Sequence, residues 1–145
     1  MIQIVFPSPE FRTERREGKE FIFDSIRRQW MVLTEEEWVR QNFIQFLIQT
    51  HGYPMALMAV EKEILLGELK KRFDILVYDK NHKPWMLIEC KAPDVKLNDA
   101  VLQQLLRYHI KVPASFLIIT NGHYTYGWEN FGNGVKEINQ MPLWM

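Results

Sequence analysis

RFDILVY at residues 72–78 and WMLIECK at residues 85–91 are the segments that indicate the fold most strongly. Both are rich in large and β-branched apolar residues, as β-strands are. The intervening segment, DKNHK at residues 79–83, has the composition of a turn. The sequence therefore predicts two antiparallel strands joined by a short turn, each with charged residues in or beside an apolar run.

The charged residues of these two strands are expected to converge. Side chains alternate between the two faces of a strand, so Glu89 and Lys91 point to one face and Cys90 to the other. A turn centred within residues 79–83 brings Asp74 opposite residue 88 or 89 of the next strand. Two carboxylates and an amine can hold a hard divalent cation and place a lysine beside its bound water. The pattern indicates a metal-dependent phosphodiesterase.

Solvated strand ends are the alternative interpretation of the same charges, because short D…ExK patterns arise by chance in many chains. The surrounding residues favour a site. A carboxylate at the end of the apolar run MLIE, residues 86–89, is costly to bury unless a partner or a metal compensates its charge.

The composition indicates one domain of 145 residues, in which acidic and basic residues balance at a formal net charge of zero. Zero net charge is neutral evidence on nucleic-acid binding, because dedicated binders are often visibly basic. Positive charge is nevertheless concentrated just before Asp74. The candidate nucleic-acid contacts are Lys70, Lys71, Arg72 and, on the first predicted helix, Arg40.

The single cysteine, Cys90, excludes an internal disulfide and a multi-cysteine zinc site, and we interpret it as a small buried apolar residue. Such a chain suits the reducing cytoplasm, which is the expected location. No apolar run is long enough to span a bilayer and the N-terminus lacks a signal-peptide pattern, so no membrane association is expected. The histidines show no metal-ligand spacing and are interpreted as surface or loop residues: His51, His82, His109 and His123.

The chain is expected to form a single domain with three parts. An arm and a hairpin occupy residues 1–33, the core occupies residues 34–128, and a C-terminal tail occupies residues 129–145. The core strands are expected at residues 55–66, 74–78, 85–91, 114–120 and 124–128.

Two helices accompany these strands. The first is expected to begin after Thr34, a good N-cap, with Glu37 at the capping-box position. The second is expected to end near Ile110, between the third and fourth core strands. A helix in that place implies a right-handed crossover and a parallel strand pair. The predicted fold class is therefore α/β, a three-layer sandwich with an αβββαβ core and a mixed sheet flanked by helices.

This order, with D…ExK on the second and third core strands, resembles the PD-(D/E)XK nuclease superfamily. More specifically, the chain resembles the N-terminal nuclease domain of type I restriction enzyme R subunits. The resemblance covers most of the chain in the expected order: FDSIR at residues 23–27, LTEEEWVRQ at 33–41, RFDI at 72–75, LIECKAP at 87–93, Gln104 with Tyr108, and IITNG at 118–122. It implies a restriction-endonuclease-like fold and a DNA endonuclease that depends on Mg²⁺ or Mn²⁺.

The resemblance also implies roles for the residues of the D…ExK pattern. Asp74 and Glu89 would be metal ligands, joined by the backbone carbonyl of Cys90. Lys91 would orient or polarise the attacking water. Phe73 stands where the superfamily pattern has proline, a position at which the family tolerates apolar residues.

Three further residues have implied roles and open alternatives. Glu37 would complete the acidic pocket as a candidate further ligand; it could instead serve only the capping box, and Glu36 is the alternative helix acid. Gln104 and Tyr108 match a QxxxY pattern found after ExK in some of these nucleases. The alternative for this pair is a helix-surface contact between residues four positions apart.

One departure from the family concerns how DNA would be reached. The R subunits continue into an ATP-driven motor, whereas this chain ends with the nuclease-like region. Cleavage would then need a different way of being directed to DNA, for which a separate motor or specificity subunit is one candidate. The alternative function is a non-catalytic nucleic-acid-binding or assembly module that retains the nuclease fold. A third function is that of a subunit whose apolar tail, residues 141–145, docks a motor protein; the tail also fits a homodimer contact.

Overall fold

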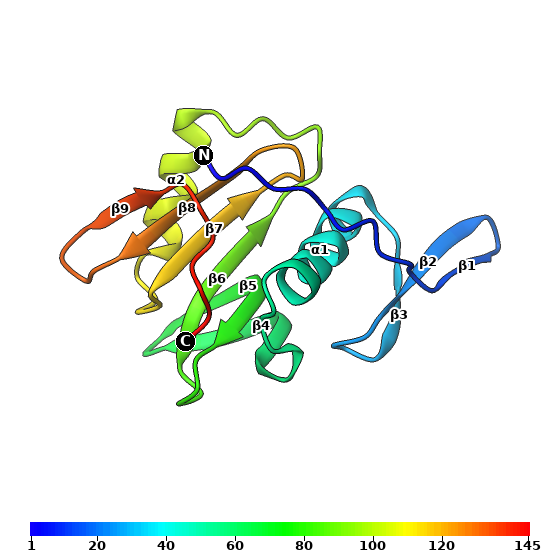
Figure 1. The fold of residues 1–145 in the computed structure, drawn as a ribbon, viewed down its shortest axis with the longest axis horizontal. Coiled ribbons are helices and arrows are strands. Elements are labelled where there is room, and N and C mark those ends of the chain that lie inside the picture. The colour runs from blue at the N-terminus through cyan, green and yellow to red at the C-terminus, as the bar shows by residue number, and fades with distance from the viewer.

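A six-stranded mixed sheet forms the centre of the structure, a computed structural model that describes residues 1–145. Its strands lie side by side in chain order (Figure 1): β4 (Met58–Leu66), β5 (Leu69–Tyr78), β6 (Pro84–Cys90), β7 (Phe116–Thr120), β8 (Thr125–Asn130) and β9 (Val135–Ile138). β6 and β7 are parallel, and every other neighbouring pair is antiparallel. The parallel pair is the one that the second helix connects, as the crossover argument predicted.

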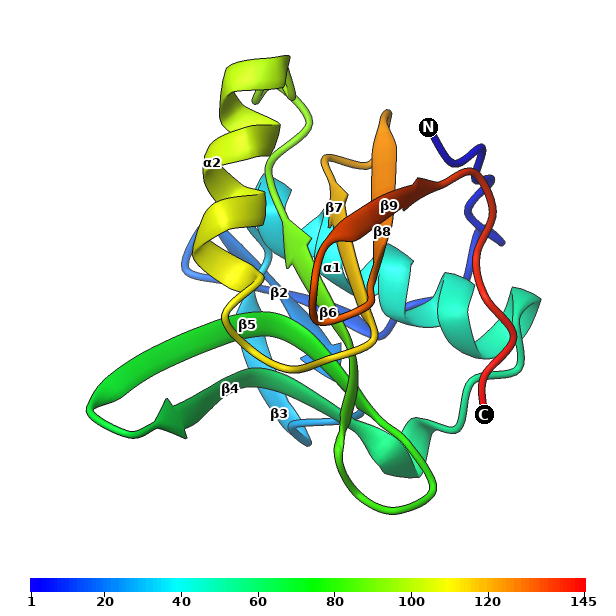
Figure 2. The same cartoon turned by 90° about the vertical axis from the view of Figure 1, so that its left-hand side faces the viewer.

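Two helices cover opposite faces of this sheet. Helix α1 (Glu35–Gln45) contributes Val39 and Phe43 to one apolar cluster, together with Ile88 of β6. Helix α2 (Asp99–His109) contributes Leu102 and Leu106 to a second cluster on the other face. Figure 2 shows α2 on one side of the sheet and α1 on the other. The three-layer α/β sandwich with an αβββαβ core is confirmed.

The start of α1 follows from its sequence. The Thr34 side chain accepts a hydrogen bond from the Glu37 amide at 3.0 Å, and the first turn carries three acidic residues. After Gln45 the chain continues as a π-helical segment, η1 (Phe46–Thr50), before Gly52 takes a positive φ of 66° that a helix cannot continue through. A short 3₁₀ turn, η2 (Met55–Leu57), then leads into β4.

A separate three-stranded antiparallel sheet precedes α1 and projects away from the central sheet (Figure 1). It consists of β1 (Thr13–Arg16), β2 (Lys19–Asp24) and β3 (Gln29–Val32). The sequence predicted the first two strands as a hairpin and missed β3, whose four residues, QWMV, are too few to show a period.

The predicted C-terminal tail contains a strand and a core residue. β9 pairs with β8 at the edge of the central sheet, and Met141 is buried in the cluster that α1 covers. β9 was missed because its sequence, VKEI, is short and half charged. Neither helix has the length and apolar character needed to cross a membrane.

Candidate functional site

Asp74 and Glu89 lie beside each other on neighbouring strands. β5 and β6 pair with Ile75 opposite Ile88, and continuing this register places Asp74 opposite Glu89. The Cys90 amide donates a hydrogen bond of 2.7 Å to Asp74 Oδ2, which ties the two strands at this point. Burial, and after it the Glu89 carboxylate, raises the pKa of Asp74 to about 7 despite hydrogen bonds from Arg40 and the Cys90 amide. The two carboxylates are therefore close enough to oppose each other's ionisation.

Glu89 has two basic neighbours. Lys91 Nζ lies 3.4 Å from Glu89 Oε1, so the two residues share a face of the strand, as their spacing predicted. On the other side, His109 Nε2 lies 3.4 Å from Glu89 Oε2. Burial alone would raise the pKa of Glu89, but His109 and Lys91 hold it below its ordinary value. Glu89 is thus the acid of the pair that ionises first.

The interpretation of His109 as a surface or loop residue is wrong. Its side chain is 2% exposed at the end of α2, and its Nδ1 atom has no hydrogen-bond partner in the chain. The ring packs against Phe73 with centroids 5.0 Å apart. The interpretation of Cys90 as a buried apolar residue is confirmed, since it is fully buried and burial raises the pKa of its thiol.

Arg40 lies in the interior of the site rather than on its surface. Its side chain is 5% exposed, and its Nη2 atom lies 2.7 Å from Asp74 Oδ1, 2.7 Å from Glu61 Oε1 and 3.2 Å from Glu36 Oε2. The Nη1 atom lies 2.6 Å from Glu37 Oε1. These contacts raise the pKa of Arg40 although burial alone would lower it. The prediction of Arg40 as a nucleic-acid contact is corrected, because four carboxylates occupy its donors.

Glu37 belongs to the same ion-pair network. Its carboxylate is 6% exposed and accepts hydrogen bonds from Arg27 at 2.9 Å and from Gln41 at 3.0 Å, besides the contact with Arg40. Arg27 and Gln41 also bond to Asp24, which is completely buried. The Glu37 carboxylate therefore points into the protein, and a role limited to the capping box is excluded. Arg40 links it to Asp74.

The predicted basic contacts before Asp74 separate into two kinds. Lys71 is buried, and its Nζ lies 3.8 Å from the centre of the Tyr108 ring, which is a cation–π contact. Burial, with Lys111 as a smaller cause, lowers the pKa of Lys71. The prediction that Lys71 contacts nucleic acid directly is therefore corrected. Lys70 and Arg72 are exposed and remain available for one.

An open groove of about 590 Å³ lies beside this network between β3, α1, β4 and β5. It is lined by Arg27, Gln29, Met31, Glu36, Glu37, Arg40, Val60, Glu61 and Arg72. Gln104 and Tyr108 are exposed on α2, in the opposite layer, and do not line it. Gln104 and Tyr108, which the resemblance implied as site residues, therefore lie apart from Glu37, because α1 and α2 cover different faces of the sheet.

No group of three or more histidine, cysteine, aspartate or glutamate side chains is arranged to hold a metal ion. The structure does provide the paired carboxylates of Asp74 and Glu89, whose oxygens are the ligands that Mg²⁺ and Mn²⁺ prefer. The opposed ionisation of this pair is the electrostatic condition that a cation relieves. Each carboxylate already has cationic or hydrogen-bonding neighbours, namely Arg40 and the Cys90 amide at Asp74, and Lys91 and His109 at Glu89.

The chain is similar to a solved structure and matches a family model. The structure is similar to a crystal structure of a candidate nuclease of DUF820 from Anabaena variabilis ATCC 29413, with a TM-score of 0.49 and 13% sequence identity over 88% of this chain and 76% of that chain. No curated protein matches the sequence. The family model described as "Type I restriction enzyme R protein N terminus" matches residues 35–142, from the start of α1 to beyond β9. Because this match spans most of the sequence, the chain belongs to the family of type I restriction enzyme R protein N-terminal domains.

Proposed function

We propose that this protein is a DNA endonuclease that hydrolyses phosphodiester bonds with Mg²⁺ or Mn²⁺. The observation that carries the proposal is the pairing of Asp74 with Glu89 on adjacent strands, with Lys91 Nζ 3.4 Å from Glu89 Oε1. Membership of a restriction-enzyme family supports it. A purely structural domain has no need of this costly group of charges at the end of two apolar strands.

The residues of the chain would divide the work as follows. Asp74, Glu89 and the backbone carbonyl of Cys90 would hold the metal, which when bound stabilises charge on the phosphate and lowers the pKa of a water molecule. Lys91 would orient the attacking water through its ammonium group. The Glu37 carboxylate would help to position Asp74 indirectly, through Arg40, which contacts both Glu37 and Asp74.

Substrate binding would come from exposed groups. Lys70 and Arg72 would contact phosphates, a role suited to exposed cations on a strand next to the site. Gln104 and Tyr108, exposed on α2, would act on the DNA rather than on the metal. A separate motor or specificity subunit would bring the protein to its site on DNA, in the cytoplasm, and a homodimer would let two copies cut both strands.

A non-catalytic nucleic-acid-binding or assembly module is the second candidate. It is favoured by the contact of Arg40 with Asp74, which neutralises a carboxylate that a metal would need. The balanced net charge of the chain is also compatible with a module that relies on a partner for DNA affinity.

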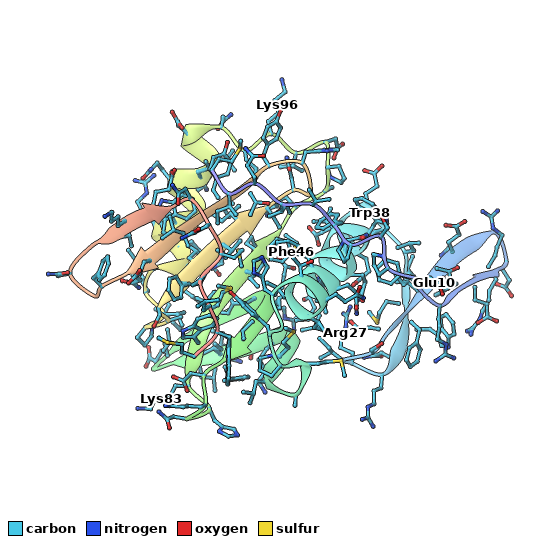
Figure 3. All side chains as sticks on the ribbon, in the orientation of Figure 1. Glu10, Arg27, Trp38, Phe46, Lys83 and Lys96 are labelled. Atoms are coloured by element: carbon cyan, nitrogen blue, oxygen red, sulfur yellow. The ribbon has the colours of Figure 1, made fainter.

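The experiment that separates the two candidates is nicking of supercoiled plasmid and cutting of single-stranded DNA in Mg²⁺ or Mn²⁺. Lys91→Ala is the test variant. Lys83→Ala is the matched control, because Lys83 is an exposed lysine at the turn between the same two strands, away from Arg27 and α1 (Figure 3). Nicking by wild type and Lys83→Ala but not by Lys91→Ala supports catalysis. DNA binding without nicking by any of the three supports the second candidate.

A further inference from the structure

One nitrogen atom of Arg40 is surrounded by carboxylate oxygens from three elements. Nη2 lies within 3.2 Å of Glu36 on α1, Glu61 on β4 and Asp74 on β5. An Nη atom carries two hydrogens, so three oxygens exceed what it can satisfy with direct hydrogen bonds. The carboxylates of Glu36, Glu61 and Asp74 are therefore held together by one shared guanidinium nitrogen.

The buried guanidinium of Arg40 does not have a hydrogen-bond partner for each of its nitrogen atoms. Its Nε atom is buried without a hydrogen-bond partner, although the side chain is 5% exposed. An unsatisfied buried donor is costly, so the carboxylates around Nη1 and Nη2 must offset that cost. Withdrawal of Arg40 toward solvent would release Nε from this position.

The charges of the network leave room for a divalent cation. Six carboxylates face three arginines and one lysine in the connected and adjoining ion pairs: Asp24, Glu36, Glu37, Glu61, Asp74 and Glu89 against Arg27, Arg40, Arg72 and Lys91. Glu89 also contacts His109. With every acid ionised and this histidine uncharged, two negative charges are left over, which is the charge that a divalent ion matches.

The open groove beside Arg40 provides space for its guanidinium outside its present position. Glu36 and Glu61 have side chains that are 46% and 31% exposed and both line the groove, as Arg40 does. Asp74 is 10% exposed and lies deeper. Asp74 does not line the groove, so a guanidinium that moved into the groove would leave Asp74 and remain beside the two glutamates.

We propose that Arg40 and a divalent cation compete for the carboxylate of Asp74, so that Arg40 is a built-in counter-ion that withdraws into the groove when metal binds. The inference deepens the proposed metal dependence and rests on it. Arg40 acts here as a positioning residue that holds Asp74, Glu37 and Glu61 together in the metal-free protein. The metal affinity of the chain would then be low while Arg40 contacts Asp74.

The test is the dissociation constant of Mn²⁺ and Mg²⁺, measured by titration calorimetry on the full chain and checked by the metal-induced rise in melting temperature. The variant Arg40→Gln removes the competing cation. Arg27→Gln is the matched control, because it removes the same charge from the same network without a contact to Asp74. We expect Arg40→Gln to bind metal roughly tenfold or more tightly than wild type, a common size of coupling between sites, and Arg27→Gln to gain clearly less.

Several results would overturn the competition. If wild type binds metal and Arg40→Gln binds it equally or more weakly, Arg40 does not compete, and the proposed metal dependence stands. If Arg27→Gln gains as much as Arg40→Gln, the effect is one of general charge and the competition is wrong. If neither wild type nor Arg40→Gln binds metal at millimolar concentration, the proposed function fails together with the inference.

Loss of folding does not hide the answer. If Arg40→Gln folds only when metal is present, the metal has replaced the guanidinium and the inference is supported. If it stays unfolded at every metal concentration, Arg40→Lys decides, since a single ammonium cannot contact Glu37 and Asp74 as the fork of Arg40 does. A lower dissociation constant than that of wild type supports the inference, and an equal or higher one overturns it.

Discussion

His109 of α2 and Glu89 of β6 are in contact, with Nε2 of the histidine 3.4 Å from Oε2 of the glutamate. The two residues are twenty positions apart in the sequence, and the contact joins the helix layer to the strand that carries the ExK residues. It gives the partly buried Glu89 a second partner besides Lys91.

Replacing His109 by alanine should therefore destabilise the protein. The variant leaves a cavity beside Phe73 and removes a partner of Glu89. We expect the free energy of unfolding to fall by about 2 kcal/mol or more, measured by urea denaturation. His123→Ala, at an exposed histidine, is the control and should change it by less than about 0.5 kcal/mol. Equal values for the two variants would show that the contact is without consequence.

The raised pKa of Asp74 should appear in the pH dependence of stability. Because the folded pKa of about 7 lies above the ordinary value of 3.8, the folded chain holds this proton more tightly than the unfolded chain. The stabilisation of the folded state that comes from the raised pKa of Asp74 is fully present below about pH 4 and is lost as the pH rises through 7. In chelator, wild-type stability should therefore fall relative to that of Asp74→Asn between these values. If denaturant titrations give the wild type and Asp74→Asn the same dependence of stability on pH, the pKa of Asp74 is not raised.

A divalent cation should raise the melting temperature of the wild type, because it binds the folded state and relieves the repulsion between Asp74 and Glu89. At a metal concentration of 100 times the dissociation constant the gain is about 2.7 kcal/mol. Asp74→Ala should lose the rise, having lost a ligand. Lys91→Ala should keep it, since the lysine serves the water, yet lose DNA cleavage. A rise retained in Asp74→Ala would place the metal elsewhere.

Gly127 of β8 tests the packing of the sheet that carries the site. A Cβ at this position would lie 2.7 Å from Ile118 Cδ1 and 2.8 Å from Ile2 Cδ1. Gly127→Ala should therefore lower the free energy of unfolding by about 1–3 kcal/mol through overpacking. Gly134→Ala is the matched control, because a Cβ there meets open space. Thermal unfolding of the two variants side by side measures the difference, and equal midpoints would count against the packing described.

Local rules were enough to predict much of the fold. The alternation of strand side chains placed Lys91 on the face of Glu89. The turn at residues 79–83 put Asp74 opposite residue 88 or 89, and the register of the structure decides for Glu89. The Thr34 cap marked the start of α1. These features depend on residues that are close in sequence or on one register, so the amino-acid pattern alone specifies them.

Contacts between residues far apart in the sequence could not be predicted from these local patterns. Arg40 resembles any exposed helix arginine until Glu61 and Asp74, 21 and 34 residues away, are brought against it. His109 is likewise buried by Phe73 and Glu89, which no spacing in the sequence relates to it. The short strands β3 and β9 have four residues each and carry too little pattern to be recognised.

The measurement that tests the account most directly is metal-started cleavage of supercoiled plasmid. Protein and plasmid are mixed in chelator, excess Mn²⁺ is added, and nicked circles are followed with time for the wild type and for Glu89→Gln, which removes a ligand charge with little change of shape. Nicking is expected to begin on addition of metal with the wild type and to be absent with Glu89→Gln. Equal nicking by both proteins, or none by the wild type, would contradict a metal-dependent nuclease at Asp74 and Glu89.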